Sequence, residues 1–298
     1  MPDAPATLHL LAPAKVNLFL EVLGRRPDGY HELRMFLVPV SLFDELVLEC
    51  LEEPGRIEVV STGNAHVESG ERNLCYRAAR FYFERAALAG GIRIGVAKRI
   101  PVGAGLGGGS SDAATTLLGL EALFGVPLSP QDRRDAAFHV GADVPFFLAR
   151  AAAWVEGVGE IVRPIPPFAP LWLVIVHPGV FLSTAAVFSR FTMGLTTPGQ
   201  PPRISHLRFQ GFVESLRNDL EPAARSLEPL VGDALESLMA AGSPGVLMSG
   251  SGSAAFGLFP DEERAQEAAS CVAKRSEAAG WRIEVVHTLA PGSSPAYA

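Results

Sequence analysis

The strongest chemical signal in the chain is a glycine-rich run in its middle, Gly103-Ala104-Gly105-Leu106-Gly107-Gly108-Gly109. Glycines lack Cβ atoms, so the backbone of such a loop can approach another group closely. The run follows a strand-like segment that Pro101 ends and precedes a helix for which Ser110, Ser111 and Asp112 supply capping side chains. Unpaired N–H groups and the helix dipole favour anions there. The run predicts a phosphate cradle; the alternative is a flexible linker.

Two common nucleotide-binding loops do not fit this run. A Walker A loop requires a lysine where Gly109 stands, which argues against a P-loop ATPase. Gly103, Gly105 and Gly108 match G-x-G-x-x-G, but a dinucleotide-binding fold also places an acidic residue about 20 positions further on. That neighbourhood is Gly-Val-Pro-Leu at 125–128, with no carboxylate.

A β-hairpin is predicted to open the fold. From Lys15 to Val22 the side chains alternate, which places one set on each face of a strand. We expect Val16, Leu18, Leu20 and Val22 on one face and Lys15, Asn17, Phe19 and Glu21 on the other. The sequence Arg-Arg-Pro-Asp-Gly at 25–29 predicts a turn, and Tyr30-His31 then leads into a second strand over 35–40.

The rest of the chain reads as alternating strands and helices, with a domain boundary in the proline-rich stretch near 154–170. We therefore expect one domain over 1–158 and a second over 159–298. In the helix after the glycine run, the spacing of Ala113, Leu117, Leu120 and Phe124 predicts a buried stripe. In the second domain we expect strands at 171–179, 246–259 (strand–turn–strand) and 281–289, and helices at 214–226, 229–241 and 261–279.

Composition excludes several classes of protein. The chain has 298 residues, 48% of them hydrophobic, and a formal net charge of −7, so neither wholesale disorder nor a nucleic-acid partner is expected. Three dispersed cysteines (Cys50, Cys75, Cys271) predict a reduced, cytoplasmic protein without a disulfide framework. No apolar run reaches the ~18–20 residues of a membrane span. The seven histidines show no zinc-site spacing, and the sequence leaves the oligomeric state open.

Three separated segments resemble the motifs of the GHMP small-molecule kinases. These are PAKVNL at 13–18, PVGAGLGGGSSDAA at 101–114 and VLMSGSGS at 246–253. The extra glycines in GLGGGSS, with PDGYHEL at 27–33 and GADVPFF at 141–147, are most similar to a branch whose alcohol substrate carries cytidine diphosphate. The resemblance implies a two-domain α+β fold. Its N-terminal domain would resemble ribosomal protein S5 domain 2, its C-terminal domain would be ferredoxin-like, and the active site would lie between them.

The resemblance also implies a reaction. The γ-phosphoryl of ATP would pass to the tertiary 2-hydroxyl of a cytidine-diphosphate-linked methylerythritol, a step of the mevalonate-independent route to isoprenoid precursors. Asp143 matches the catalytic aspartate of the family and Lys15 its active-site lysine. A carboxylate that accepts the hydroxyl proton suits this chemistry. Taken alone, Asp143 could be a helix N-cap and Lys15 a solvated strand residue.

The same resemblance assigns binding residues. For the cytidyl alcohol these are Asn17, Tyr30, His31, Thr184 and Phe188, with Phe181 as a competing stacking partner and Gly250 and Ser251 in the third motif. For ATP they are Pro101, the glycine run 103–109, Ser110 and Ser111, together with Asn73 and Lys98 near the adenosine. Tyr30 and His31 could instead be ordinary strand and core residues. An N-cap and a strand-end lysine would explain Asn73 and Lys98 equally well.

Magnesium is expected, because the β- and γ-phosphates of ATP need charge neutralisation. No carboxylate cluster identifies its protein ligand; Ser110 or Ser111 could contribute a hydroxyl, or phosphates and water could hold the ion. Two alternatives stay open. One is a GHMP kinase of mevalonate or homoserine type, and the other is a relative that binds nucleotide without catalysis.

Overall fold

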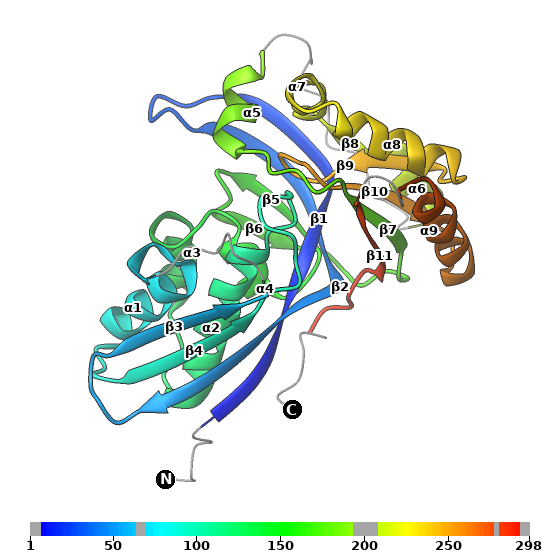
Figure 1. Ribbon diagram of the computed structural model, residues 1–298. Helices are drawn as coiled ribbons and strands as arrows, with labels where there is room; N and C mark the ends of the chain where they lie inside the picture. Colours follow the sequence, from blue (N-terminus) through cyan, green and yellow to red (C-terminus); the bar gives the residue numbers. More distant parts are fainter. Residues whose placement is uncertain (1–6, 64–69, 193–207, 277–279, 293–298) are drawn as a thin grey trace.

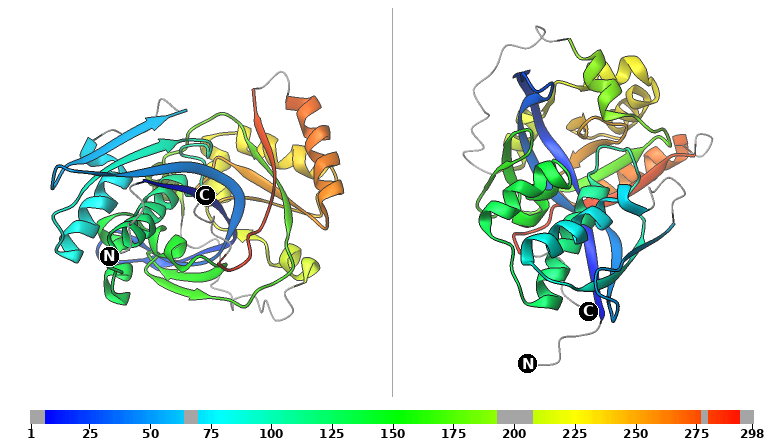
Figure 2. Two further views of the ribbon diagram at one scale, coloured as in Figure 1. Left: turned by 90° about the horizontal axis from the view of Figure 1, so that it is seen from below. Right: turned by 90° about the vertical axis from the view of Figure 1, so that its left-hand side faces the viewer.

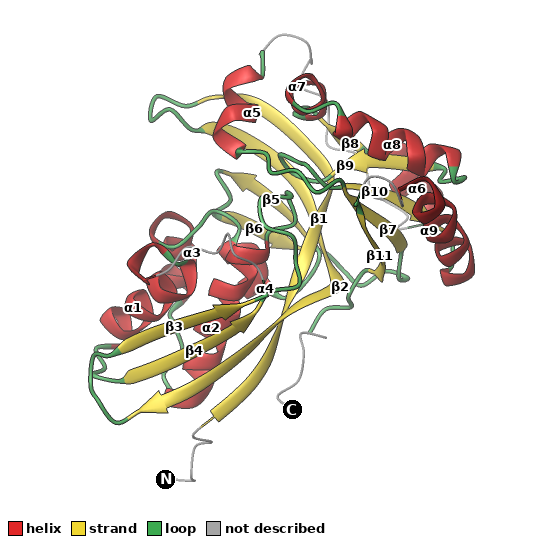
Figure 3. Ribbon diagram, viewed as in Figure 1, coloured by secondary structure: helices red, strands yellow, loops and turns green. Residues whose placement is uncertain are grey.

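The computed structural model describes residues 7–63, 70–192, 208–276 and 280–292. Two sheets form its frame, and helices cover one side of each (Figures 1 and 3). None of the described helices is both long and apolar enough to cross a bilayer. All three cysteines lie in the described residues and are free thiols.

The first sheet has seven strands. The strands are β1 (Thr7–Arg25), β2 (His31–Leu51), β3 (Ile57–Thr62), β4 (Gly91–Ala97), β5 (Ala153–Gly157), β6 (Ile161–Pro164) and β8 (Arg217–Asn218). Their order is β3-β4-β2-β1-β8, with β5 paired to β2 and β6 to β5. Both β1 and β2 are long, and the hairpin that they form crosses the molecule and ends beside α5 (Figures 1 and 2).

Four helices and a short 3₁₀ turn, η1 (Gly70–Arg72), accompany this sheet. The helices are α1 (Leu74–Ala86), α2 (Gly108–Phe124), α3 (Pro130–His139) and α4 (Val144–Ala149). The predicted stripe of α2 is confirmed, since Ala113, Leu117 and Leu120 are buried in the core and Phe124 packs against it. That burial orients α2 so that its first turn lies at the end of the glycine run.

The second sheet has the ferredoxin-like strand order that was predicted. Its strands are β7 (Trp172–His177), β9 (Gly245–Met248), β10 (Ala255–Phe259) and β11 (Arg282–His287), arranged as β11-β7-β10-β9. The remaining helices are α5 (Thr184–Arg190), α6 (Phe209–Ser215), α7 (Glu221–Leu227), α8 (Leu230–Ala240) and α9 (Glu262–Ser276). Of these, α8 and α9 pack on the sheet. The loop between β9 and β10 is the second glycine-rich turn, as predicted.

Two local predictions need correction, whereas the domain boundary at 158–159 stays a prediction. Positions 158–159 lie in the turn between β5 and β6 of the first sheet, and the next strand, Trp172–His177, belongs to the second sheet. The single helix expected over 214–226 is interrupted, because Arg217–Asn218 pairs in parallel with β1. Ser110, Ser111 and Asp112 do not cap α2, because the helix already begins at Gly108.

The alternation predicted for β1 also fails at one point. Asn17 pairs with Leu37 and Phe19 with Phe36, which leaves Leu18 as the extra residue of a β-bulge. An extra residue in a strand moves each side chain after it to the opposite face of the sheet. Leu20 therefore joins Lys15 and Asn17 in lining one cavity instead of sharing the face of Val16.

Candidate active site

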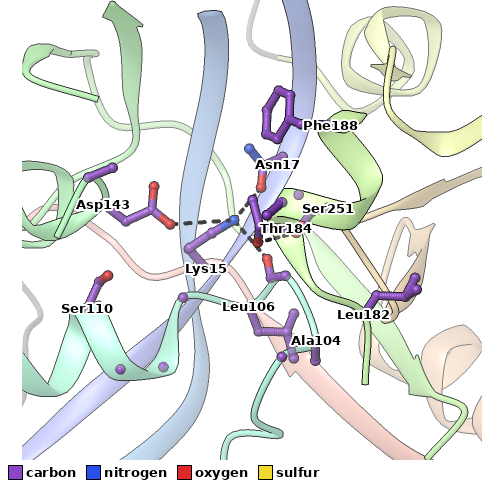
Figure 4. A pocket seen from close by; sticks show the side chains of 18 of the residues that line it. Lys15, Asn17, Ala104, Leu106, Ser110, Asp143, Leu182, Thr184, Phe188 and Ser251 are labelled. Atoms are coloured by element: carbon purple, nitrogen blue, oxygen red, sulfur yellow. Dashed lines mark hydrogen bonds and ion pairs between the residues drawn. The ribbon is translucent and has the colours of Figure 1, made fainter. Parts of the chain in front are cut away.

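A cavity of about 1460 Å³ lies between the β1–β2 hairpin, the glycine run and the segment around α5. Among the described residues, nearly every residue predicted to bind or react lines it; the two exceptions are Ser111 and Phe181. The lining set is Lys15, Asn17, Tyr30, His31, Asn73, Lys98, Pro101, residues 103–110, Asp143, Thr184, Phe188, Gly250 and Ser251. Figure 4 draws the cavity from close by and labels ten of the residues that line it.

The glycine run wraps the cavity and ends on α2. Gly103, Gly105 and Gly107 have φ values of 67°, 72° and 72°, a backbone region that side chains disfavour. Gly107 is the N-cap of α2, so the cap residue brings no side-chain oxygen to the first N–H groups of the helix. These donors and the positive end of the helix dipole suit a phosphate.

Gly105 is also the point where the two glycine-rich turns touch. A Cβ atom at Gly105 would lie 2.0 Å from the carbonyl oxygen of Ser249. The Gly105 carbonyl accepts hydrogen bonds from Lys15 Nζ at 2.7 Å and from Ser249 Oγ at 2.9 Å. The absence of a side chain at this position therefore lets β1 and both turns converge.

Lys15 and Asp143 face each other across the cavity (Figure 4). Lys15 Nζ lies 4.0 Å from Asp143 Oδ2 and donates a hydrogen bond to Asn17 Oδ1 at 2.5 Å. Burial lowers the pKa of Lys15, and the Asp143 carboxylate opposes that lowering. Only 4% of the Lys15 side chain is exposed, so the alternative interpretation of Lys15 as a solvated strand residue is wrong.

Asp143 directly precedes α4, but its side chain does not cap this helix with a hydrogen bond. Its carboxylate is 28% exposed and lines the cavity. A carboxylate held beside an ammonium group and open to a ligand can accept a proton from a hydroxyl. The N-cap interpretation does not account for this placement.

Aromatic groups gather at the tip of the β1–β2 hairpin. The rings of His31 and Phe188 stack with centroids 4.7 Å apart and planes 21° apart. Tyr30 is not a core residue, because it is 66% exposed. His31 is not one either, because it lines the cavity. Burial, and secondly the charge of Arg25, lower the pKa of His31, which keeps its imidazole neutral near pH 7.

The segment around α5 supplies the opposite wall. Thr184 Oγ1 and Ser251 Oγ are hydrogen-bonded at 2.9 Å, which joins α5 to the second glycine-rich turn. Phe181 lies outside the lining of the cavity, because its ring packs over Gly103: a Cβ atom there would be 2.0 Å from Phe181 Cδ2. Of the two aromatic candidates, Phe188 is therefore the one that borders the cavity.

Asn73 and Lys98 line the cavity and also have structural partners. The Asn73 side chain accepts a hydrogen bond from Cys75 N at 2.8 Å, so it caps α1. Lys98 Nζ is ion-paired with Asp44 and donates a hydrogen bond to Asp112 Oδ2 at 2.6 Å. Sequence reasoning missed Asp44, because nothing in the pattern of β2 indicates that its carboxylate is buried behind the glycine run.

The buried group of Asp44, Lys98 and Asp112 predicts a pH-dependent stability. Burial by itself would lower the pKa of Lys98. The nearby Asp112 and Asp44 have a larger opposite effect, so the pKa of Lys98 is raised. Burial, assisted by Asp44, raises the pKa of Asp112 to about 8 from the ordinary 3.8. The folded protein then holds a proton that the unfolded chain releases, and this stabilisation is lost as pH rises through the folded pKa.

We therefore expect the Tm of the ligand-free protein to fall by a few degrees between about pH 6 and about pH 9. In Asp112→Asn, which cannot titrate, the fall should be smaller. Calorimetry at both pH values measures it, with Asp233→Asn on the exposed face of α8 as a control that keeps the full decrease. Equal decreases in wild type and Asp112→Asn would contradict the assignment.

No group of three or more His, Cys, Asp or Glu side chains suited to a metal ion occurs within the described ranges. Ser110 lines the cavity on the side of Asp143 (Figure 4), whereas Ser111 is fully buried. Of the two hydroxyls considered for magnesium, that of Ser110 is the one that borders the cavity.

Comparison with known proteins decides the family. Residues 73–150 match the GHMP kinases N terminal domain, and residues 206–278 match the GHMP kinases C terminal domain. The chain belongs to the GHMP kinase family. The first matched region contains the glycine run and Asp143, and the second contains the turn at 249–252.

Relatives of this GHMP kinase share nearly its whole length. It is 44% identical to the 4-diphosphocytidyl-2-C-methyl-D-erythritol kinases of Geobacter sp. (strain M21) and Citrifermentans bemidjiense, over 95% of this chain and 99% of each relative. A crystal structure of 4-(cytidine 5'-diphospho)-2C-methyl-D-erythritol kinase matches with a TM-score of 0.78 at 40% identity, over 94% of this chain and 98% of that one. A homoserine kinase from Cytophaga hutchinsonii gives a TM-score of 0.78 at 21% identity, over 98% and 97% of the two chains, which shows the shared fold alone.

Proposed function

We propose that this GHMP kinase transfers the γ-phosphoryl of ATP to the 2-hydroxyl of 4-diphosphocytidyl-2-C-methyl-D-erythritol. The main support is that one cavity contains three parts. These are a phosphate cradle, the Lys15–Asp143 pair, and an end of the cavity lined by the rings of His31 and Phe188. The names of the relatives at 44% identity supply the substrate that fits these three parts. The product belongs to the mevalonate-independent route to isoprenoid precursors.

In the proposed mechanism, the glycine run and the N-terminus of α2 bind the phosphates of ATP. Asp143 accepts the proton of the attacking hydroxyl, and the Lys15 ammonium, fixed by Asn17 and the Gly105 carbonyl, orients that hydroxyl and balances developing charge. Asn73 and Lys98 border the adenosine end. Each of these residues is held by hydrogen bonds or an ion pair before ligands arrive, which reduces the reorganisation needed for transfer.

Magnesium would neutralise the β- and γ-phosphates when bound with ATP. We assign its protein contact to the Ser110 hydroxyl, which lines the cavity in the first turn of α2. No carboxylate takes part in this assignment.

The aromatic end predicts which substitutions weaken alcohol binding. Phe188→Ala and Tyr30→Ala should each raise the KM for the cytidyl alcohol by about tenfold, because each loses a face for stacking on the pyrimidine. The KM for ATP should stay within about twofold of wild type. Steady-state kinetics with each substrate varied in turn measures both constants.

Phe181→Ala is the matched comparison, since Phe181 lies over Gly103 rather than beside His31. It should leave the KM for the alcohol closer to wild type than Phe188→Ala does. An unchanged KM for the cytidyl alcohol in both Tyr30→Ala and Phe188→Ala would show that neither ring stacks on the pyrimidine and would contradict this assignment of the aromatic end.

A coupled assay for ADP release tests the activity itself. We expect release that depends on both ATP and the cytidyl alcohol, with mevalonate and homoserine giving little turnover. ATP binding without ADP release would instead identify a non-catalytic relative. Cytoplasmic localisation stays a prediction based on the dispersed cysteines, and the absence of nucleic-acid partners one based on the net charge of −7.

A further inference from the structure

A short segment from the C-terminal half is built into the sheet next to the reacting residues. β8 pairs in parallel with β1 at Phe19 and Leu20. Asp219, directly after β8, adds two bonds to β1: its N–H donates to Leu20 O at 3.0 Å, and its Oδ2 accepts from Val22 N at 3.0 Å. The segment is thereby fixed to the strand that carries Lys15.

Asn218, in β8 itself, bonds to the second glycine-rich turn instead. Its Nδ2 donates to Met248 O and to Gly250 O, both at 2.8 Å. Its Oδ1 accepts from Leu220 N at 3.0 Å, and the residue is only 7% exposed. A primary amide has two N–H donors, and here both hold the backbone of one turn.

That turn touches residues at the reacting end of the cavity. A Cβ atom at Gly250 would lie 3.1 Å from Lys15 Nζ, so the turn lies beside the ammonium with no room for a side chain between them. Ser249 Oγ donates to the Gly105 carbonyl, which also receives Lys15 Nζ. A displacement of the turn would therefore move Lys15 relative to Asp143.

We propose that Asn218 is a positioning residue for phosphoryl transfer, which acts by holding the Gly250 turn against Lys15. Asn218 does not itself line the cavity that the described residues form, so it acts through the turn. Misplacement of a reacting group by about 1 Å can cost about 100-fold in rate. This inference rests on the kinase activity proposed above.

Two substitutions test it. Asn218→Asp keeps the size of the side chain but replaces both donors with a carboxylate oxygen facing two carbonyls, and Asn218→Ser is the milder change if the first does not fold. At saturating substrates and well below Tm, we expect kcat to fall about 10- to 100-fold, with each KM within about threefold of wild type. Asp219→Asn is the matched control: it loses the carboxylate that accepts from Val22 N and pairs with Arg217, so we expect a lower Tm and a kcat within about twofold of wild type.

Amide hydrogen exchange at Ser249 and Gly252, whose N–H groups donate to Ala254 O and Ser249 O at 2.9 Å, gives a readout that does not need activity. We expect faster exchange in Asn218→Ser but not in Asp219→Asn. A kcat for Asn218→Ser within twofold of wild type, or equal kcat losses in the Asn218 and Asp219 variants, would overturn the positioning role. If wild type releases no ADP, the proposed function fails, and unchanged exchange in Asn218→Ser would separately show that Asn218 does not hold the turn.

Discussion

Asp143→Asn is expected to lower kcat by about 10²- to 10⁴-fold, the usual contribution of a positioned proton acceptor. Asparagine has the same shape but cannot accept the proton of the attacking hydroxyl or pair with the Lys15 ammonium 4.0 Å away. The KM for ATP should change less than about threefold, because Asp143 lies outside the glycine run that binds the phosphates. Steady-state kinetics with ATP and alcohol varied separately distinguishes the two constants.

Asp233→Asn, on the exposed face of α8, serves as the control and should retain wild-type kinetics. A raised KM for ATP with an unchanged kcat would be the reverse of the expected pattern. That result would make Asp143 a structural residue at the start of α4 and would leave the reaction without its proton acceptor.

Gly105→Ala is expected to abolish most of the activity by disrupting the contact between the two glycine-rich turns. The φ of 72° costs an alanine about 1–2 kcal/mol by itself. The new Cβ would also lie 2.0 Å from the Ser249 carbonyl oxygen, and backbone on both sides must move to relieve this overlap. Because the Gly105 carbonyl accepts from Lys15, we expect kcat to fall and the KM for ATP to rise, each by about tenfold or more.

Gly211→Ala provides the comparison, since its Cβ meets nothing within 4 Å and its backbone is helical. It should keep wild-type kinetics and gain slightly in stability. Kinetics and Tm of both variants measure the difference. A Gly105→Ala protein with wild-type KM and kcat would show that the tight contact at Ser249 is not required.

Features that depend on neighbours in the chain could be predicted from the sequence. Periodicity and turn residues predicted the hairpin from its strands at 15–22 and 35–40, the stripe on α2 and the strand–turn–strand at 246–259; the observed hairpin is longer, over 7–51. The placement of Lys15 beside Asp143 was expected from motif resemblance, since periodicity says nothing about contacts 128 positions apart. Both residues border the same cavity, as that resemblance implied.

Features that depend on distant parts of the chain were missed for physical reasons. The bulge at Leu18 lies in a run of three apolar residues, Leu18-Phe19-Leu20, so the sequence does not reveal that the side chains change faces there. Arg217–Asn218 lies in a helix-like context and becomes a strand only because β1 offers it an unpaired edge. Asp44 looks like a surface residue until Lys98 and two backbone N–H groups surround it.

We expect the length of the β1–β2 hairpin to limit the size of alcohol that this enzyme uses. Lys15 and Asn17 stand part-way along β1, whereas Tyr30 and His31 stand at the tip of the same hairpin, beyond the bulge at Leu18. If Asp143 accepts the proton and the tip binds the base, strand geometry sets the span between the reacting hydroxyl and that base. A short alcohol would then occupy one end only, and the unliganded backbone would already select by molecular length.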